Sequence, residues 1–119
     1  MDAFKLFDAE YKFVCIIWEL EPINSTKLVN VCLDRLGWKK STTYTVLKKL
    51  CERGVLQNID TVVSALVKRE QVQKYESEEL LDRAFDGSLP QFLAAFLHNR
   101  KLSKDEAADL RRMIQEASE

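Results

Sequence analysis

The spacing of apolar residues changes at Gly54, and this change limits the folds that the chain can adopt. Before Gly54, apolar residues recur at helical spacing in three successive segments, which Glu21-Pro22 and Gly37 separate. After it, a β-branched run from Thr61 to Val67 and a shorter apolar segment predict two strands around Asn58-Ile59-Asp60. Three helices followed by a small hairpin is the order of a winged helix-turn-helix, whose third helix can lie in the major groove of DNA.

Capping and breaking residues set the limits of the predicted helices. Asp8 can cap the first helix, which ends at Glu21-Pro22 because the residue before proline avoids helical backbone angles. Asn24 starts the second helix, and the third runs from about Lys40–Thr42 to a stop at Gly54. On the first helix we expect an inward apolar stripe made of Phe7, Tyr11, Val14, Cys15 and Trp18.

Cysteine and histidine usage indicates a reducing compartment and no metal centre. Cys15, Cys32 and Cys51 are 17 and 19 residues apart and form no CxxC pair, so we expect buried, reduced thiols. The single histidine, His98, has no clustered ligand beside it, and we expect no metal and no cofactor. Without a membrane-spanning apolar run or a signal-peptide pattern, the expected location is the cytoplasm.

The third predicted helix is basic in a chain that is acidic overall. From Arg35 to Arg53 there are six cations and one anion, Glu52, whereas the whole chain has a formal net charge of −1. Ammonium and hydroxyl groups bind phosphate oxygens and base edges, so we expect this helix to contact double-stranded DNA. The predicted DNA-binding residues are Lys39, Lys40, Ser41, Thr42, Tyr44, Thr45, Lys48, Lys49 and Arg53.

Within this set, the hydroxyl-bearing side chains and the cations are expected to have different roles. We expect Thr42, Tyr44 and Thr45 to reach base edges, and the lysines and Arg53 to bind phosphates. Two alternatives stay open, because Ser41 and Thr42 could instead cap the helix and Tyr44 could pack against the second helix.

The second half of the chain predicts three more helices that form a dimer. Asp86-Gly87 is a helix stop, and Ser88 and Ser103 are helix starts before apolar stripes. So short a unit buries too little surface alone, so it should pack against a second copy or against the first domain. We favour a two-fold homodimer, because two-fold pairs are the commonest oligomers. We therefore expect a DNA-binding domain at residues 1–70 and a helical dimerisation domain at residues 71–119. The predicted dimerisation residues are Leu81, Phe85, Leu89, Phe92, Leu93, Phe96, Leu97, Leu110 and Ile114.

Three motifs, in order, cover nearly the whole chain. The first is the opening helix, Phe7-Asp-Ala-Glu-Tyr-Lys-Phe-Val-Cys-Ile-Ile-Trp18. The second is the pattern Trp38, Thr42, Thr45, Leu47, Lys49, Leu50, Gly54 and Leu56. The third is Leu81-Asp-Arg-Ala-Phe-Asp-Gly-Ser-Leu89, followed by Leu93-Ala-Ala-Phe-Leu97. Together these motifs resemble the penicillinase-repressor family of bacterial transcription regulators, to which the copper-responsive repressors are related.

The resemblance implies a homodimeric repressor. Its N-terminal winged helices would bind an inverted-repeat operator, and its C-terminal helices would hold the dimer. It also implies that a membrane sensor-protease signal leads to cleavage within the C-terminal helices, which lifts repression. The corresponding bond is Ala95–Phe96, where the family pattern has Asn before Phe.

Two further positions depart from the family pattern. The wing from Asn58 to Leu66 has neither the usual glycine nor a cation, and Leu66 stands near the place of the expected tyrosine. No cysteine follows Cys51, which argues against copper sensing.

A winged helix without a basic wing also fits a second function, as a protein-interaction module without strong DNA binding. Salt-sensitive DNA binding would distinguish the two. An enzyme is not expected, since the sequence shows no Ser-His-Asp, Cys-His, paired-carboxylate or Gly-rich phosphate motif.

Overall fold

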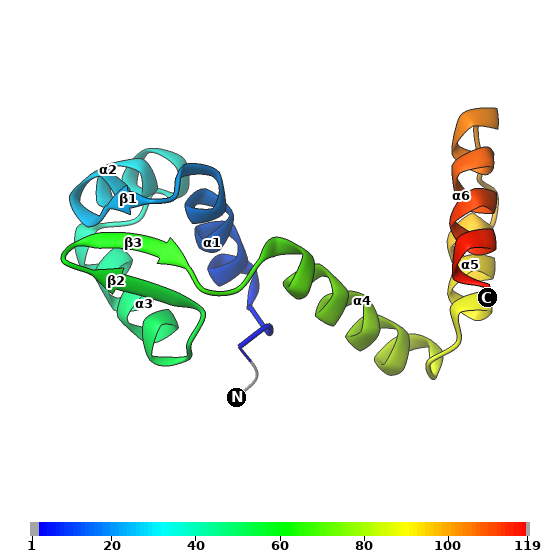
Figure 1. Ribbon diagram of the computed structural model, residues 1–119, viewed down its shortest axis with the longest axis horizontal. Helices are drawn as coiled ribbons and strands as arrows, with labels where there is room; N and C mark the ends of the chain where they lie inside the picture. Colours follow the sequence, from blue (N-terminus) through cyan, green and yellow to red (C-terminus); the bar gives the residue numbers. More distant parts are fainter. Residues whose placement is uncertain (1–2, 119) are drawn as a thin grey trace. The chain divides into compact units, whose positions relative to one another are not determined.

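The computed structural model describes residues 3–118 and divides the chain into two compact units, one ending at Leu80 and the other beginning at Leu81. The elements, labelled in Figure 1, are α1 (Asp8–Leu20), β1 (Ile23–Asn24), α2 (Ser25–Leu36), α3 (Lys40–Glu52), β2 (Leu56–Ile59), β3 (Val62–Ala65), α4 (Arg69–Phe85), α5 (Leu89–Leu97) and α6 (Lys104–Ala117). The domain limit expected after residue 70 lies in the first turn of α4, whereas the division falls further along the same helix.

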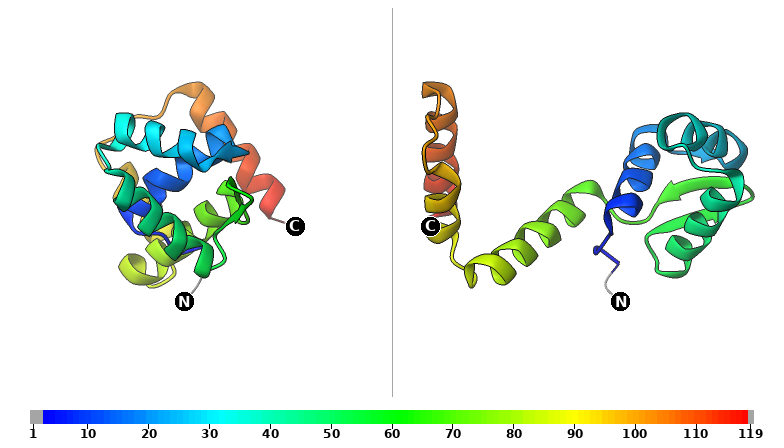
Figure 2. Two further views of the ribbon diagram at one scale, coloured as in Figure 1. Left: turned by 90° about the vertical axis from the view of Figure 1, so that its left-hand side faces the viewer. Right: turned by 180° about the vertical axis from the view of Figure 1, so that it is seen from behind.

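The first unit combines three helices with a small antiparallel sheet, which confirms the predicted winged helix. The strand order is β1-β3-β2, and each strand lies against a different helix, β1 against α2, β2 against α3 and β3 against α1. Figure 2 shows this arrangement from two further sides. The sequence predicted the hairpin alone. The third strand, β1, arises because the extended residues that lead into α2 pair with β3, with Ile23 opposite Val63.

The hairpin turn lies slightly later than predicted. It consists of Asp60 and Thr61, whose φ angles of 51° and 66° are the left-handed values that a tight two-residue hairpin requires. The Thr61 carbonyl accepts a hydrogen bond from the Ser25 amide at 2.8 Å, and the Thr61 hydroxyl accepts one from the Asn24 side chain at 3.2 Å. These bonds hold the turn against the start of α2, which explains how a threonine is kept in this conformation.

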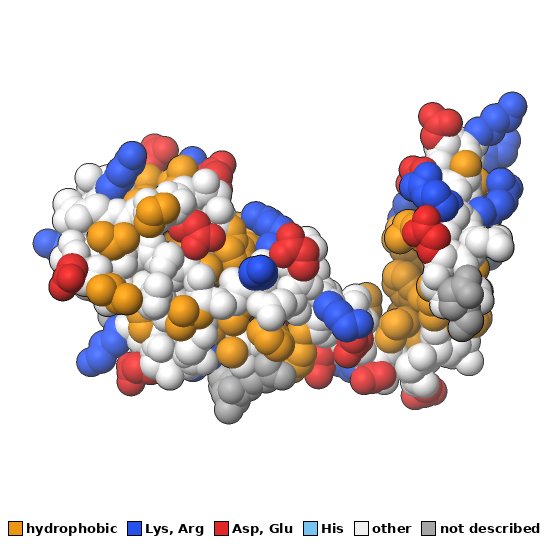
Figure 3. Space-filling model, in the orientation of Figure 1, with side chains coloured by type: hydrophobic (Ala, Val, Ile, Leu, Met, Phe, Trp, Pro, Cys, Tyr) orange, Lys and Arg blue, Asp and Glu red, His pale blue; other side chains and the backbone are white. Residues whose placement is uncertain are grey.

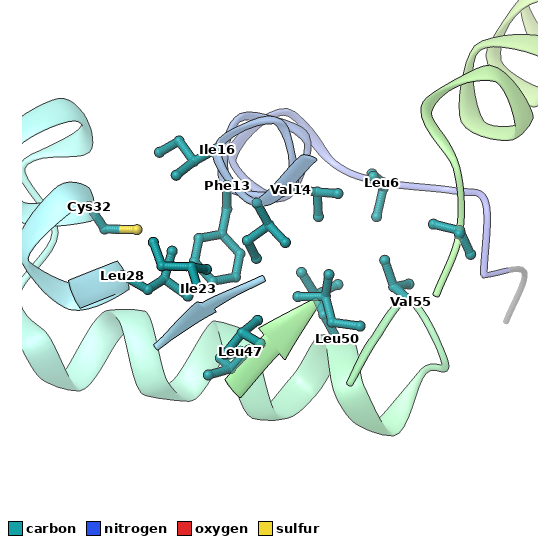
Figure 4. Packing of buried hydrophobic residues seen from close by; sticks show 14 of the residues in the cluster. Leu6, Phe13, Val14, Ile16, Ile23, Leu28, Cys32, Leu47, Leu50 and Val55 are labelled. Atoms are coloured by element: carbon teal, nitrogen blue, oxygen red, sulfur yellow. The ribbon is translucent and has the colours of Figure 1, made fainter. Parts of the chain in front are cut away.

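The core of the first unit lies between the three helices and the sheet. Figure 4 shows the buried apolar side chains of this core pointing toward one another from α1, α2, α3 and the strands. The largest fully buried apolar side chains are Phe13, Ile17, Leu28, Leu50, Leu56, Val14, Val55, Val63 and Val72. Both tryptophans are partly buried against this core, with the Trp38 ring 5.3 Å from that of Phe13.

The inward face of α1 differs from the predicted stripe. The buried residues of α1 are Glu10, Phe13, Val14, Ile16 and Ile17. Of the predicted stripe only Val14 is buried, and Phe7 is 55% exposed. Asp8 is also the first helical residue rather than the cap, which is Phe7. Because α1 is apolar around most of its circumference, spacing alone permits more than one inward face, and packing against β3 and α2 selects this one.

The second unit follows the predicted stops and starts. Asp86 and Gly87 end α4 with φ angles of 49° and 78°. The side chains of Ser88 and Ser103 accept hydrogen bonds from backbone amides at 3.1 Å and so cap α5 and α6. Among the residues described, no helix is long and apolar enough to span a lipid bilayer.

Of the three cysteines, only Cys32 is buried, whereas Cys15 and Cys51 are partly exposed, and all three are free thiols. The expectation of buried thiols therefore holds for Cys32 alone.

Candidate nucleic-acid interface

Helix α3 buries one side and presents a polar side. Its buried residues are Thr43, Leu47 and Leu50, which recur at positions i, i+4 and i+7. The exposed residues of its opposite side include Ser41, Thr45 and Lys48, which follow one another at the same spacing. Packing against α2 and β2 thus fixes which face of the helix remains available to a ligand.

The N-terminal end of α3 is strongly electropositive. Lys39 is the N-cap and makes no side-chain capping bond, and the first turn holds no acidic residue. Lys40 follows as the first helical residue, and both lysines are exposed. Free backbone amides at a helix start carry partial positive charge, so two added lysines leave this end without the anion that would stabilise it. Such an end is suited to bind a phosphate group.

The three residues that were predicted to contact base edges differ in their exposure to solvent. Thr42 and Thr45 are exposed on the polar side of α3. Tyr44 is half-buried against the core, and its hydroxyl donates to the Ser25 hydroxyl oxygen across a long 3.5 Å. The structure therefore places Tyr44 in the packing role against α2 that was the alternative for this residue. Neither Ser41 nor Thr42 caps α3.

Arg53 occupies a different position from the exposed phosphate ligand that the sequence predicted. Its side chain is 11% exposed, and its guanidinium donates to the Glu10 carboxylate at 2.8 Å and to the Lys5 carbonyl. Because these bonds join the end of α3 to the start of α1, Arg53 is part of the internal structure of the first unit. The exposed cations of α3 and its N-cap are Lys39, Lys40, Lys48 and Lys49.

Glu10 is the residue of this region that the sequence interpretation missed. One carboxylate oxygen, Oε1, accepts the Phe7 amide at 3.0 Å, and the other, Oε2, faces Arg53 at 2.8 Å and the Lys49 ammonium at 3.7 Å. Burial by itself would raise the pKa of Glu10, but the Phe7 amide and the two cations outweigh it and lower this pKa below its ordinary value. Its spacing of three residues after the cap is the signal that could have found it.

The wing offers no positive charge to DNA. No lysine or arginine stands between Gly54 and Val67. Its exposed apolar residues are Ile59, Val62 and Leu66, at 59%, 43% and 53% exposure. Between them, the Gln57 amide donates to the Ser64 hydroxyl at 3.1 Å. The electropositive surface of the first unit is thus provided by α3 and its start rather than by the hairpin.

The predicted dimerisation residues of the second unit are only partly covered. No residue of α5 or α6 is buried, and Figure 3 shows apolar side chains gathered on one side of this unit. The exposed ones in the predicted set are Leu89, Phe96 and Ile114, and the half-buried ones are Leu81, Phe85, Phe92, Leu93, Leu97 and Leu110. Phe92 forms ring contacts with Phe85 and Phe96, at 5.4 and 5.8 Å between centroids.

Ala95 and Phe96, the residues of the predicted cleavage bond, lie inside α5 and are both exposed. The guanidinium of Arg100 lies 4.5 Å from the centre of the Phe96 ring. The bond is therefore on the surface but in helical conformation.

Comparison with known proteins places this architecture among bacterial regulators. A family model described as penicillinase repressor matches residues 6–116. The penicillinase repressor of Bacillus licheniformis is 24% identical over 116 residues, which cover 94% of this chain and 91% of that protein. The methicillin resistance regulatory protein MecI of Staphylococcus aureus is 20% identical, and that of Mammaliicoccus sciuri 19%, each with 94% of both chains covered.

Proposed function

This chain belongs to the penicillinase repressor family, and from that premise we propose that it is a sequence-specific DNA-binding repressor of transcription in the cytoplasm, acting as a homodimer on an inverted-repeat operator. The observation that carries the proposal is the exposed side of α3. It combines hydroxyl groups with four uncovered lysines in a first unit whose 12 Lys and Arg are matched by 12 Asp and Glu, so that the rest of the unit is acidic. Hydroxyls and ammonium groups on one helix face are the chemistry that reads and holds a DNA groove.

Each exposed residue of α3 has a proposed role. Ser41, Thr42 and Thr45 are placed to reach base edges, while Lys48 and Lys49 are placed to hold phosphates on either side. Lys39 and Lys40 would hold a further phosphate at the helix start, where free amides favour an anion. Tyr44 would support the helix from behind. This division predicts that sequence preference depends on the hydroxyls and salt dependence on the lysines.

The proposed dimer uses the second unit. Its exposed Leu89, Phe96 and Ile114 lie on helices that bury nothing by themselves. Covering such side chains with the same residues of a second copy is the usual two-fold solution, and it would bring two α3 helices to one operator.

The proteolytic relief of repression implied by the family resemblance would act at Ala95–Phe96. Both residues are exposed, but the bond is helical, so α5 would have to unwind locally before a protease could bind it in extended form. Incubation with a cognate membrane sensor-protease pathway, followed by mass spectrometry, would test this step. A chain that stays intact while its operator is released would contradict it.

A second candidate function rests on the wing. Exposed Ile59, Val62 and Leu66 without any cation suit a protein surface better than a phosphate backbone. In that case the chain would be a protein-interaction module, and its binding to DNA would be weak or absent.

The deciding experiment is selection of bound duplexes from a random DNA library by the purified protein, followed by sequencing. An enriched inverted repeat is expected, and its spacing would give the distance between the two half-sites. Binding of the enriched duplex should weaken steeply as salt increases, since each neutralised phosphate releases counterions. If no sequence is enriched and a salt series is flat, the repressor proposal fails and the protein-interaction function is favoured.

A further inference from the structure

We infer that Arg53 is a positioning residue for DNA binding, which neutralises the buried carboxylate of Glu10 and thereby leaves the Lys49 ammonium free to bind a phosphate. This inference rests on the proposed function and adds to it a residue that does not itself touch DNA. Its basis is that two cations of very different exposure face the same carboxylate oxygen.

The distances and exposures of the three side chains differ in a way that separates their roles. Arg53 lies 2.8 Å from Oε2 of Glu10 and is 11% exposed, whereas Lys49 lies 3.7 Å from the same oxygen and is 60% exposed. Glu10 itself is 8% exposed. Arg53 is therefore the inner partner of this carboxylate, and Lys49 is an outer partner whose ammonium already extends into solvent.

Arg53 is also better held than Lys49. A second hydrogen bond from its guanidinium to the Lys5 carbonyl fixes it beside Glu10. A guanidinium is always charged and offers several donors in a rigid plane, so it satisfies a buried carboxylate better than a lysine does. Glu10 is therefore neutralised whether or not Lys49 is nearby.

The consequence appears when DNA is present. A DNA phosphate competes with Glu10 for the Lys49 ammonium. Lys49 can leave Glu10 at low free-energy cost only if another cation still neutralises this carboxylate. Without Arg53, Lys49 would be the remaining partner of a buried carboxylate, and leaving an unpaired buried charge is costly. Loss of Arg53 would thus cost one phosphate contact per protomer without removing a residue that contacts DNA.

The slope of log Kd against log salt for the enriched duplex measures the number of phosphate contacts directly, because each contact contributes about 0.9 to the slope. We expect Lys49→Gln to lower the slope by about 0.9 per protomer. Arg53→Gln should lower it similarly, although Lys49 is intact. The double variant Glu10→Gln, Arg53→Gln should return it to the wild-type value, since Lys49 then has no carboxylate to neutralise.

Lys48→Gln is the matched control, because Lys48 is exposed one residue away on the same helix. It should lower the slope by the same amount in the wild-type and the Arg53→Gln backgrounds. Circular dichroism at each salt concentration gives the folded fraction, by which each Kd is corrected. A purely structural role for Arg53 would change the folded fraction and leave the corrected slope unaltered.

The outcomes distinguish the inference from the function on which it rests. A steep wild-type slope that Arg53→Gln leaves unchanged overturns the inference alone. A lowered slope that the double variant fails to restore also overturns it, and assigns Arg53 a phosphate contact of its own. An unchanged slope in Lys49→Gln removes Lys49 from the phosphate contacts and overturns the inference, while a steep wild-type slope would still support DNA binding. A flat wild-type slope rejects DNA binding itself, and the inference with it.

Discussion

The two units of this chain use apolar residues in different ways. In the first, Phe13, Ile17 and Leu50 are fully buried between three helices and a sheet. In the second, no residue of α5 or α6 is buried, and Phe96 and Ile114 are about half exposed or more, at 49% and 58%. Two helices of 9 and 14 residues bury too little surface to form a core by themselves. From this difference we expect the first unit to be complete in one copy and the second to need another surface.

The largest effect is expected from opening a cavity in the complete core. Leu50→Ala should lower the free energy of unfolding by about 2–5 kcal/mol, because a fully buried side chain is lost from a packed site. Urea denaturation followed by circular dichroism measures it, and the loss should not depend on protein concentration. A loss that falls as concentration rises would mean that the first unit also depends on association, and the comparison between the units would fail.

In the second unit, a substitution of an apolar residue should change self-association rather than the stability of a single copy. Ile114→Asp is expected to weaken self-association by about 3 kcal/mol, because a two-fold interface would bury the new carboxylate twice. Sedimentation equilibrium gives the dimer Kd. Gln115→Asp, at the next exposed position, is the control and should have little effect. If both variants remain as associated as the wild type, another part of the chain holds the dimer or the chain is a monomer.

The sequence predicted the elements of both units well, because local chemistry decides them. Gly37 and Asp86-Gly87 end helices through left-handed backbone angles. Asn24, Ser88 and Ser103 begin helices by accepting an amide hydrogen bond. These signals lie within four residues of the feature that they specify, so one sequence is enough to read them.

What the sequence could not predict depends on partners far along the chain. The inward face of α1 is set by packing on β3, and Ile23 joins the sheet only because Val63 lies opposite. Arg53 looked like one more cation of a basic helix, since nothing local reveals a carboxylate 43 residues away. In the candidate site, the exposed lysines could be predicted from charge alone, whereas the separation of Arg53 and Tyr44 from them required the fold.

Glu10 differs from the other core residues of the first unit because it is a buried charged residue among apolar ones. The pH dependence of stability measures what this buried charge contributes. Glu10→Gln should reduce stability at neutral pH by about 2 kcal/mol, the range for a hydrogen bond to a charged group. The folded-state pKa is lowered, so the wild-type advantage is present above the ordinary glutamate pKa of 4.5 and is lost as pH falls through the folded value. Urea denaturation of both proteins across this range measures it. An advantage that persists unchanged in acid would contradict the lowered pKa.

The smallest effect is expected at the surface of the first unit, where function requires exposure rather than burial. Thr45→Ala should leave stability nearly unchanged, because its side chain is exposed on α3. It should reduce discrimination at one base pair of each half-site by about 1 kcal/mol, while affinity for the other positions is kept. Lys48→Gln is the contrasting variant, since loss of a phosphate contact should weaken all duplexes alike.

Competition between the enriched duplex and its single-base variants measures how Thr45→Ala and Lys48→Gln each change affinity at every position of the half-site. Thr45 lies at the centre of the exposed side of α3, with Ser41 and Lys48 one turn away in each direction, so a base contact there should affect one position of the half-site and not its neighbours. If Thr45→Ala weakens every duplex equally and Lys48→Gln changes preference at one position, the two roles are exchanged. The surface of the first unit would then read DNA through its lysines.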